Sequence, residues 1–248
     1  MANQNFNTFG RGGVIADQAS FDVGLRQHMI RVYNYMASGL ALSGIVAFVL
    51  FSSSELAGLF FQVTNGRVVG LNVLGWVAIF APLGLLLLVS FRAATMSVGA
   101  VQAIYWAVTA LMGVSLSLLL FRYTGASVAR TFFVTAASFG ALSLYGYTTK
   151  RDLSGMGTFL IMGVVGILVA MLINMFLQSS AMALAISAIG VLLFAGLTAY
   201  DTQRIKILYF YVQGTEMAGK TVIMGALQLY LDFINMFQFL LMFLGNRR

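Results

Sequence analysis

Long apolar stretches separated by short polar breaks make up most of the chain. Each stretch is close to the roughly 20 residues that a helix needs to cross the hydrocarbon core of a membrane. Seven such stretches lie at about Val32–Phe51, Asn72–Phe91, Val98–Phe121, Thr131–Tyr147, Thr158–Leu177, Ala181–Tyr200 and Val222–Leu244. The pattern therefore predicts an all-α membrane protein, a bundle of seven transmembrane helices.

The first 29 residues contain no apolar stretch of this kind. Up to residue 20 they are rich in Gly, Asn, Gln and Ser, a composition that does not support a packed core. No small-residue cleavage site follows an apolar segment, so we expect no signal peptide. The predicted organisation is a mobile N-terminal tail over residues 1–29 and a seven-helix transmembrane domain over residues 30–248.

The last apolar stretch carries a carboxylate, Asp232, about halfway along. A charge at that depth costs roughly 2.5–3.5 kcal/mol on insertion scales, so an ionisable residue there is a functional-site hypothesis by default. At about 100° per residue, Gly225, Gln228, Asp232 and Asn235 form a single polar stripe. Because such a stripe must face protein or water, we expect this helix to sit inside the bundle.

The amino-acid composition further limits which classes of membrane protein are possible. The chain is 60% hydrophobic and 8% charged, whereas soluble domains are about 25% charged. It has no cysteine, which excludes disulfides, thiolate metal sites and cysteine nucleophiles. Its single histidine, His28, belongs to the predicted polar tail, and every lysine is in a predicted loop. Imidazole metal clusters, a Ser/His protease pair and a retinal-binding lysine are therefore not expected, and we predict a non-enzyme without a cofactor.

The net charge of +7 reflects topology rather than nucleic-acid binding, because the basic residues cluster in loops. With the N-terminus inside, nine lie on the cytoplasmic side: Arg11, Arg26, Arg31, Arg92, Lys150, Arg151, Arg204, Lys206 and Lys220. Three lie outside: Arg67, Arg122 and Arg130. The distribution predicts a cytoplasmic N-terminus. The C-terminal Arg247 and Arg248 lie outside after seven full spans, or inside if the last segment is re-entrant.

Two of the seven acids lie in or at the end of an apolar stretch, Asp232 and Asp201. Asp201 ends the sixth stretch, on the helix face that also carries Thr198. One alternative makes Asp201 an interfacial carboxylate paired with Arg204; another makes Asp232 a packing carboxyl bonded to Gln228, Asn235 or backbone. Contact between the two acids requires the sixth helix to continue past Tyr200, with a longer linker down to Lys220 returning the chain, or the seventh to begin after Val222.

Three segments carry a family resemblance: TTKRDLSGMG (Thr148–Gly157), TAYDTQRIK (Thr198–Lys206) and LYLDFINMF (Leu229–Phe237). They resemble the signatures of the transmembrane Bax inhibitor motif family (Bax inhibitor-1-like), in its bacterial branch. The likeness covers nearly the whole chain beyond the N-terminal tail. It implies a compact seven-helix bundle with the last helix central and wrapped by the other six, in the bacterial inner membrane.

The same resemblance implies a pH-sensitive calcium leak channel in which two aspartates form a proton-sensing pair. By motif these are Asp201 in TAYDTQ and Asp232 in LYLDFIN, and they are also the candidate Ca²⁺ ligands. An arginine that ends the second helix is implied as a latch on the pair; here it is Arg92 in VSFR. Some relatives carry an acid in the second span, where this sequence has Ala81 and apolar neighbours.

Physical chemistry explains why such a pair could gate. Two carboxylates in hydrogen-bonding reach cannot both ionise at low cost, so they share a proton and titrate together. The shared proton can tie two helices together, and its loss leaves two negative charges that repel or receive Ca²⁺ through oxygen ligands. We expect Gln228, Asn235 and Thr198 to support the pair.

Three functions remain open. The first is a passive cation leak gated by protons, with Ca²⁺ and H⁺ as the species handled in the lipid bilayer. The second is a non-conducting regulator that binds membrane proteases or other membrane proteins, as some bacterial members of the resembled family are described. The third is a proton-coupled cation exchanger. The polar stripe on the seventh span favours a pathway over a scaffold.

Overall fold

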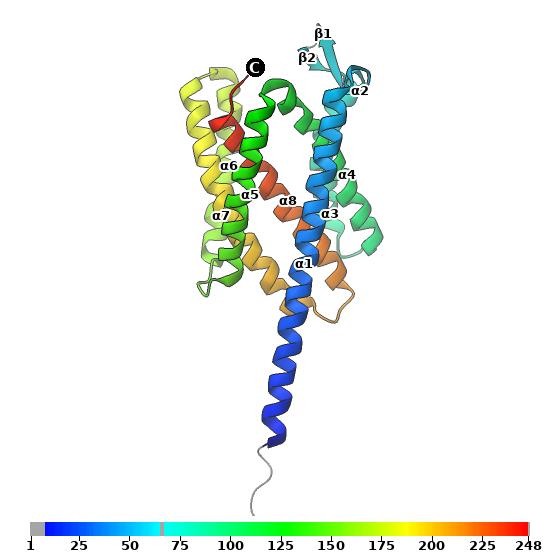
Figure 1. The fold of residues 1–248 in the computed structure, drawn as a ribbon, viewed down its shortest axis with the longest axis vertical. Coiled ribbons are helices and arrows are strands. Elements are labelled where there is room, and N and C mark those ends of the chain that lie inside the picture. The colour runs from blue at the N-terminus through cyan, green and yellow to red at the C-terminus, as the bar shows by residue number, and fades with distance from the viewer. Residues whose placement is uncertain (1–7, 65–66, 248) are drawn as a thin grey trace, which may run out of the picture.

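The computed structural model describes residues 8–64 and 67–247, and it is mostly helical (Figure 1). The long helices are α1 (Thr8–Ser52), α3 (Val73–Arg92), α4 (Val98–Arg122), α5 (Gly125–Thr148), α6 (Ser154–Leu177), α7 (Ser180–Val212) and α8 (Met217–Leu244). In this described part of the chain, seven helical segments are long and apolar enough to cross a membrane. The prediction of an all-α, seven-helix membrane fold is confirmed.

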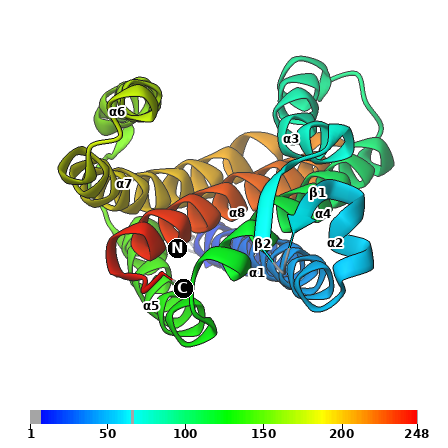
Figure 2. The same cartoon turned by 90° about the horizontal axis from the view of Figure 1, so that it is seen from above.

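The last helix, α8, is the centre of the bundle (Figure 2). Helices α1, α4, α5 and α7 pack directly on it, whereas α3 packs on α4 and α6 packs on α7. Of the 28 residues of α8, 17 are buried. The central position of the last helix is therefore confirmed, but four helices surround it closely instead of the expected six. The reason is geometric, since α4 and α7 already occupy the positions between α8 and the two outer helices.

Helix α7 is longer than its apolar stretch predicted. It continues 12 residues beyond Tyr200 to Val212, and α8 begins at Met217, so only residues 213–216 connect the two helices. Gly214 turns this connection with φ +74°, a conformation that favours glycine. The continuation past Tyr200 is the condition that contact between the two acids required, and it is met. The expected longer linker down to Lys220 is wrong, because α8 already begins at Met217. The polar residues after Tyr200 did not end the helix, because α7 buries Thr202, Gln203 and Ile205 there.

The first helix also differs from its prediction. It runs without a break from Thr8 to Ser52, so no structural boundary marks the expected end of a tail at residue 29; residues 1–7 lie outside the described part. His28 was expected in a polar tail. Instead it is 5% exposed and packs with its ring centroid 5.2 Å from that of Tyr209, because the extension of α7 lies beside α1.

A small element between α1 and α3 was not predicted. Helix α2 (Ser54–Phe60) leads into strands β1 (Phe61–Thr64) and β2 (Arg67–Leu71), which pair antiparallel. Phe61 is buried in a cluster with Ala78 and Val114. The strands lie at one end of the bundle (Figure 1). The Asn65-Gly66 dipeptide between two short β-branched segments is a turn signal that could have indicated the hairpin.

The C-terminus lies at the opposite end of the bundle from the N-terminal part of α1 (Figure 1). Helix α8 runs through the bundle, and the backbone N–H of Thr124, beyond α4, donates to the carbonyl of Asn246 at 3.1 Å. Arg247 also forms an antiparallel bridge with Tyr123. The last segment is therefore a full span, and the re-entrant alternative is not observed.

Close contact between α5 and α7 generates a test of the packing. A Cβ on Gly146 would collide with the backbone carbonyl of Ala199, whereas a Cβ on Gly140, in the same helix, would meet open space. We expect Gly146→Ala to destabilise the protein by about 1–3 kcal/mol, the usual cost of overpacking. Gly140→Ala is the matched control and should be neutral or stabilising. Thermal unfolding in detergent micelles measures both, and equal melting temperatures for the two variants would contradict this packing.

Candidate functional site

Asp201 of α7 and Asp232 of α8 meet inside the bundle. They are 2% and 4% exposed, and a side-chain hydrogen bond joins them. A bond between two carboxyl groups requires a proton on one of them. The side chain of Gln228, one turn before Asp232, also reaches Asp201. The pair is therefore a single hydrogen-bonded unit across the α7–α8 interface.

The contact depends on the length of α7 and on two glycines. Because α7 continues past Tyr200, Asp201 lies within a helix and not at its end. On one side of the pair, a Cβ on Gly190 of α7 would approach the ring of Phe239 to 2.6 Å. On the other side, a Cβ on Gly225 of α8 would lie 3.2 Å from Ile205. The absence of side chains at these two positions allows the close approach that the short aspartate side chains need.

The two simpler alternatives for the aspartates do not describe this arrangement. Asp201 is buried rather than interfacial, and Arg204, the positive group that acts on it, has an exposed side chain. Asp232 is bonded to Asp201, while the Asn235 side chain donates to the carbonyl of Leu231 at 2.8 Å. One oxygen of each carboxyl group, Oδ1 of Asp201 and Oδ2 of Asp232, has no hydrogen-bond partner among the described residues.

Arg92 is not brought to the pair. It ends α3 with an exposed side chain, and α3 packs on α4 instead of α7 or α8. The basic residue that joins this end of α3 to α8 is Lys220, whose Nζ donates to the carbonyl of Ala94 at 3.1 Å. The expected latch is therefore absent from this arrangement, because a second layer of helices separates Arg92 from the aspartates.

The predicted supporting residues divide into two groups. Gln228 reaches Asp201, but Thr198 donates to the carbonyl of Phe194 in its own helix at 2.7 Å, and Asn235 likewise bonds within α8.

One face of α8 is only half-buried. It carries Gln228 and Asn235, and also Met224, Leu231, Gln238 and Met242. We call Gln228, Asn235 and Gln238 the α8 amide line. The polar stripe predicted from the sequence ends at Asn235 and does not include Gln238, three residues further along the same line.

A chain of hydroxyl groups reaches the residue beside Asp201. The Oη of Tyr33 lies 2.6 Å from Oγ of Ser143, which lies 2.9 Å from Oγ1 of Thr202. Thr202 in turn donates to the carbonyl of Thr198 at 2.7 Å. The chain links α1, α5 and α7 in the interior. Sequence patterns did not indicate it, because single hydroxyl residues on three helices carry no spacing signal.

Two of the three family-like segments contact each other. The backbone N–H of Leu153 donates to Oε1 of Gln203 at 2.8 Å, and Nε2 of Gln203 donates to the carbonyl of Arg151 at 2.8 Å. Nζ of Lys206 donates to the carbonyl of Tyr147 at 2.8 Å, near the end of α5. These bonds attach the extended part of α7 to the α5–α6 connection, and so hold the helix segment that carries Asp201.

The α5–α6 connection has its own polar contact. The backbone N–H of Ser154 donates to Oδ1 of Asp152 at 2.8 Å. This hydrogen bond holds the pKa of the exposed Asp152 carboxyl below its ordinary value. It stabilises the start of α6 above the ordinary aspartate pKa, and the stabilisation is lost as the pH falls through the lowered one. Asp152 therefore stabilises the α5–α6 connection and is not part of the buried aspartate pair.

The capacity of the site for a metal is limited. Within the part of the chain that the structure describes, no group of three or more His, Cys, Asp or Glu side chains comes together. Ca²⁺ takes six to eight oxygen ligands in a resident site. Two carboxyl groups with a neighbouring amide are therefore too few ligands for an all-protein Ca²⁺ cage.

These features define a seven-helix membrane protein with a buried aspartate pair between its central helix, α8, and the neighbouring α7. The chain belongs to the Bax inhibitor-1 family, because the family model described as inhibitor of apoptosis-promoting Bax1 matches residues 25–248.

Individual relatives are similar in sequence to this chain over nearly its whole length. The inner membrane protein YbhL of Escherichia coli is 44% identical over 91% of this chain and 94% of its own length. An uncharacterized protein of Caulobacter vibrioides is 48% identical over 98% of this chain and 99% of its own length. The protein RP147 of Rickettsia prowazekii is 45% identical over 92% of this chain and 93% of its own length. The resemblance to the bacterial branch of this family is confirmed.

The two hydrogen bonds of Gln203 give a second test. Gln203→Met keeps the length of the side chain but leaves the buried N–H of Leu153 unpaired, which should cost about 1–3 kcal/mol. We expect a lower melting temperature and faster tryptic cleavage after Lys150 and Arg151. Gln213→Met, at the exposed end of α7, is the control and should leave both unchanged. Unaltered cleavage in Gln203→Met would show that these bonds do not hold the connection.

Proposed function

We propose that the protein is a pH-sensitive cation leak channel of the bacterial inner membrane, with Ca²⁺ as a permeant ion and its N-terminus in the cytoplasm. The observation that carries the proposal is the hydrogen bond between Asp201 and Asp232 across two buried helix faces. An acidic pair inside a bundle is costly to place there, and a purely structural contact between α7 and α8 does not need it. The location follows that described for YbhL and the distribution of basic residues.

The shared proton is the proposed lock. With one proton, the pair carries a single charge and ties α7 to α8. Without it, two negative charges about 4 Å apart repel by roughly 4 kcal/mol at an effective dielectric constant near 20. About 5.5 kcal/mol moves a two-state equilibrium from 1:99 to 99:1. Loss of the proton therefore supplies most of the energy that opening requires, and the leak should rise as the pH rises.

The proposed route for ions follows the α8 amide line. Gln228, Asn235 and Gln238 lie on the one line of α8 that neighbouring helices leave half-buried, and Gln228 reaches the pair. Amide and carboxylate oxygens are the ligands that Ca²⁺ prefers. The unpartnered oxygens of the two aspartates extend this row of ligands into the bundle. A row with so few ligands binds an ion weakly enough for the ion to leave again, as conduction requires.

The proposal predicts the behaviour of purified protein in liposomes that contain a Ca²⁺ indicator. The leak should increase with pH by at most about tenfold per pH unit, the limit for release of one proton. Asp201→Asn and Asp232→Asn each leave one carboxyl group without its like-charged neighbour, so the pH response should disappear. Asp152→Asn changes an exposed acid outside the spans and should keep the full response.

Two results would contradict this proposal. The first is a leak whose pH profile is the same in Asp201→Asn, Asp232→Asn and the unmodified protein. The second is the absence of any ion flux from protein that is folded and correctly inserted. Strict dependence of Ca²⁺ movement on an opposing proton gradient would instead indicate a proton-coupled exchanger, in which the same pair carries the proton.

A non-conducting regulator is the second candidate, and α6 favours it. Among the described long helices, α6 packs closely only on α7, and of its own residues Gly157, Leu160 and Ile167 are buried. Its outer face is therefore available to another membrane protein as well as to lipid. Stable co-purification of a membrane protease, lost on substitution of Phe159 and Met162 on that face, together with no flux, would favour this function.

A further inference from the structure

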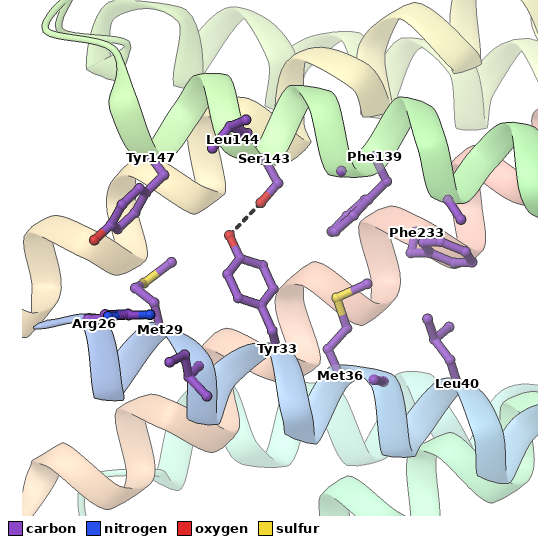
Figure 3. Close-up of a pocket in the computed structure, with 14 residues that line it drawn as sticks. Arg26, Met29, Tyr33, Met36, Leu40, Phe139, Ser143, Leu144, Tyr147 and Phe233 are labelled. Carbon is purple, nitrogen blue, oxygen red and sulfur yellow. Dashed lines mark hydrogen bonds between the residues drawn. The ribbon is translucent and has the colours of Figure 1, made fainter.

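A cavity of about 620 Å³ lies between α1, α5 and α8 (Figure 3), and neither Asp201 nor Asp232 lines it. This volume falls in the range of roughly 300–1,000 Å³ that is usual for small-molecule sites. Its wall includes Tyr33, Met36 and Leu40 of α1, Phe139 and Ser143 of α5, and Phe233 of α8. Between its two ends the wall is apolar except for Tyr33 and Ser143, which satisfy each other with a hydrogen bond of 2.6 Å.

The cavity opens sideways, between α1 and α5. Both helices pack on α8 or α7 but not closely on each other. The residues at the opening, Ile30, Gly140 and Leu144, are exposed. Because α1 and α5 both qualify as membrane spans, the opening between them faces the lipid bilayer.

The two ends of the cavity differ in chemistry. Arg26 and Tyr147 lie at one end, and Leu40 and Phe233 at the other (Figure 3). A second positive group is present at the first end, since Nζ of Lys206 lies 5.1 Å from the centroid of the Tyr147 ring. The site therefore matches an amphiphile with a negative head and a hydrocarbon tail.

The length of the cavity indicates which amphiphile. Arg26 and Leu40 are 14 residues apart on one helix, which corresponds to roughly 21 Å at 1.5 Å per residue. Half of a hydrocarbon core of about 30 Å is about 15 Å. A lipid tail that enters from the surface at the Arg26 end can therefore lie along the cavity over the whole thickness of its own leaflet.

We propose that this cavity binds one acyl chain of an anionic phospholipid, with the phosphate at Arg26. Basic pockets between transmembrane helices bind anionic headgroups, and the apolar wall replaces the bilayer around the chain. The bound chain lies against the Tyr33–Ser143 pair, from which the hydroxyl chain leads to Thr202 beside Asp201. The proposal concerns lipid binding alone and does not depend on ion conduction.

Photo-labelling tests whether the acyl chain of the lipid binds in the cavity. The protein is reconstituted in phosphatidylcholine vesicles that contain phosphatidylglycerol with a diazirine in its acyl chain, irradiated, and mapped by peptide mass spectrometry. Labels should concentrate on the cavity wall, at Met36, Leu40 and Phe139. Gly140→Phe fills the opening from a position whose Cβ meets no atom within 4 Å, and should reduce this labelling several-fold. Ala37→Phe should do the same from the α1 side.

Gly166→Phe is the matched control for the filled opening. Gly166 is also an exposed helical glycine with open space around it, but it lies on α6, away from the cavity. The variant should keep the labelling of the unmodified protein. Equal labelling of the cavity wall in Gly140→Phe, Ala37→Phe and Gly166→Phe would overturn the proposal, as would labels spread evenly over the outer faces of α1, α5 and α6.

The headgroup is tested by competition of unlabelled phosphatidylglycerol and phosphatidylcholine against the same probe. The protein should prefer phosphatidylglycerol, and Arg26→Gln should reduce this preference by about fivefold, the factor expected for one interfacial basic residue. Arg31→Gln, an exposed arginine of α1 outside the cavity lining, should not. The same reduction in both variants, or no preference in the unmodified protein, would refute recognition of the headgroup by Arg26.

Discussion

The burial of two carboxyl groups in one helix interface is the constraint on which the rest of the structure depends. An acid in an apolar interior must be neutral or hydrogen-bonded, and Asp201 and Asp232 meet this condition through each other and Gln228. The arrangement requires close helices, which Gly190 and Gly225 permit. It also requires a long α7, which Gln203 and Lys206 attach to the end of α5 and its connection to α6.

The helices around this centre are held unequally. Helix α8 is buried along most of its length, and its contact with α1 contains a polar bond, because Oη of Tyr230 lies 2.6 Å from Oγ of Ser43. Helices α3 and α6 pack on one long neighbour each and face outward. Segments with few buried contacts open at the lowest free energy. Movements of the bundle are therefore expected in the outer layer and at the α1–α5 gap before they reach α8.

Much of the fold could be predicted because hydropathy is a local property. The seven apolar stretches correspond to the seven spanning helices, and an acid halfway along the last one indicated a candidate site before any contact was known. The predictions stayed conditional or failed where a neighbouring helix decides the outcome. Helix α7 passes Tyr200 because its polar residues Thr202 and Gln203 are bonded by α5 and the α5–α6 connection. Arg92 is remote from the pair because α3 lies in the outer layer.

The sequence by itself determined the number of spanning helices, the depth of Asp232 and the membership of the family, since each depends on residue types along one segment. The family resemblance implied that Asp201 and Asp232 form a pair, but only the tertiary structure shows their side chains in contact. Tertiary structure also decided that four helices pack closely on α8 and that a cavity lies between α1 and α5. The physical reason is that an apolar side chain is equally stable against lipid and against another helix. Hydropathy therefore places residues at a depth in the membrane, while the rotation and register of packed helices determine which of them meet.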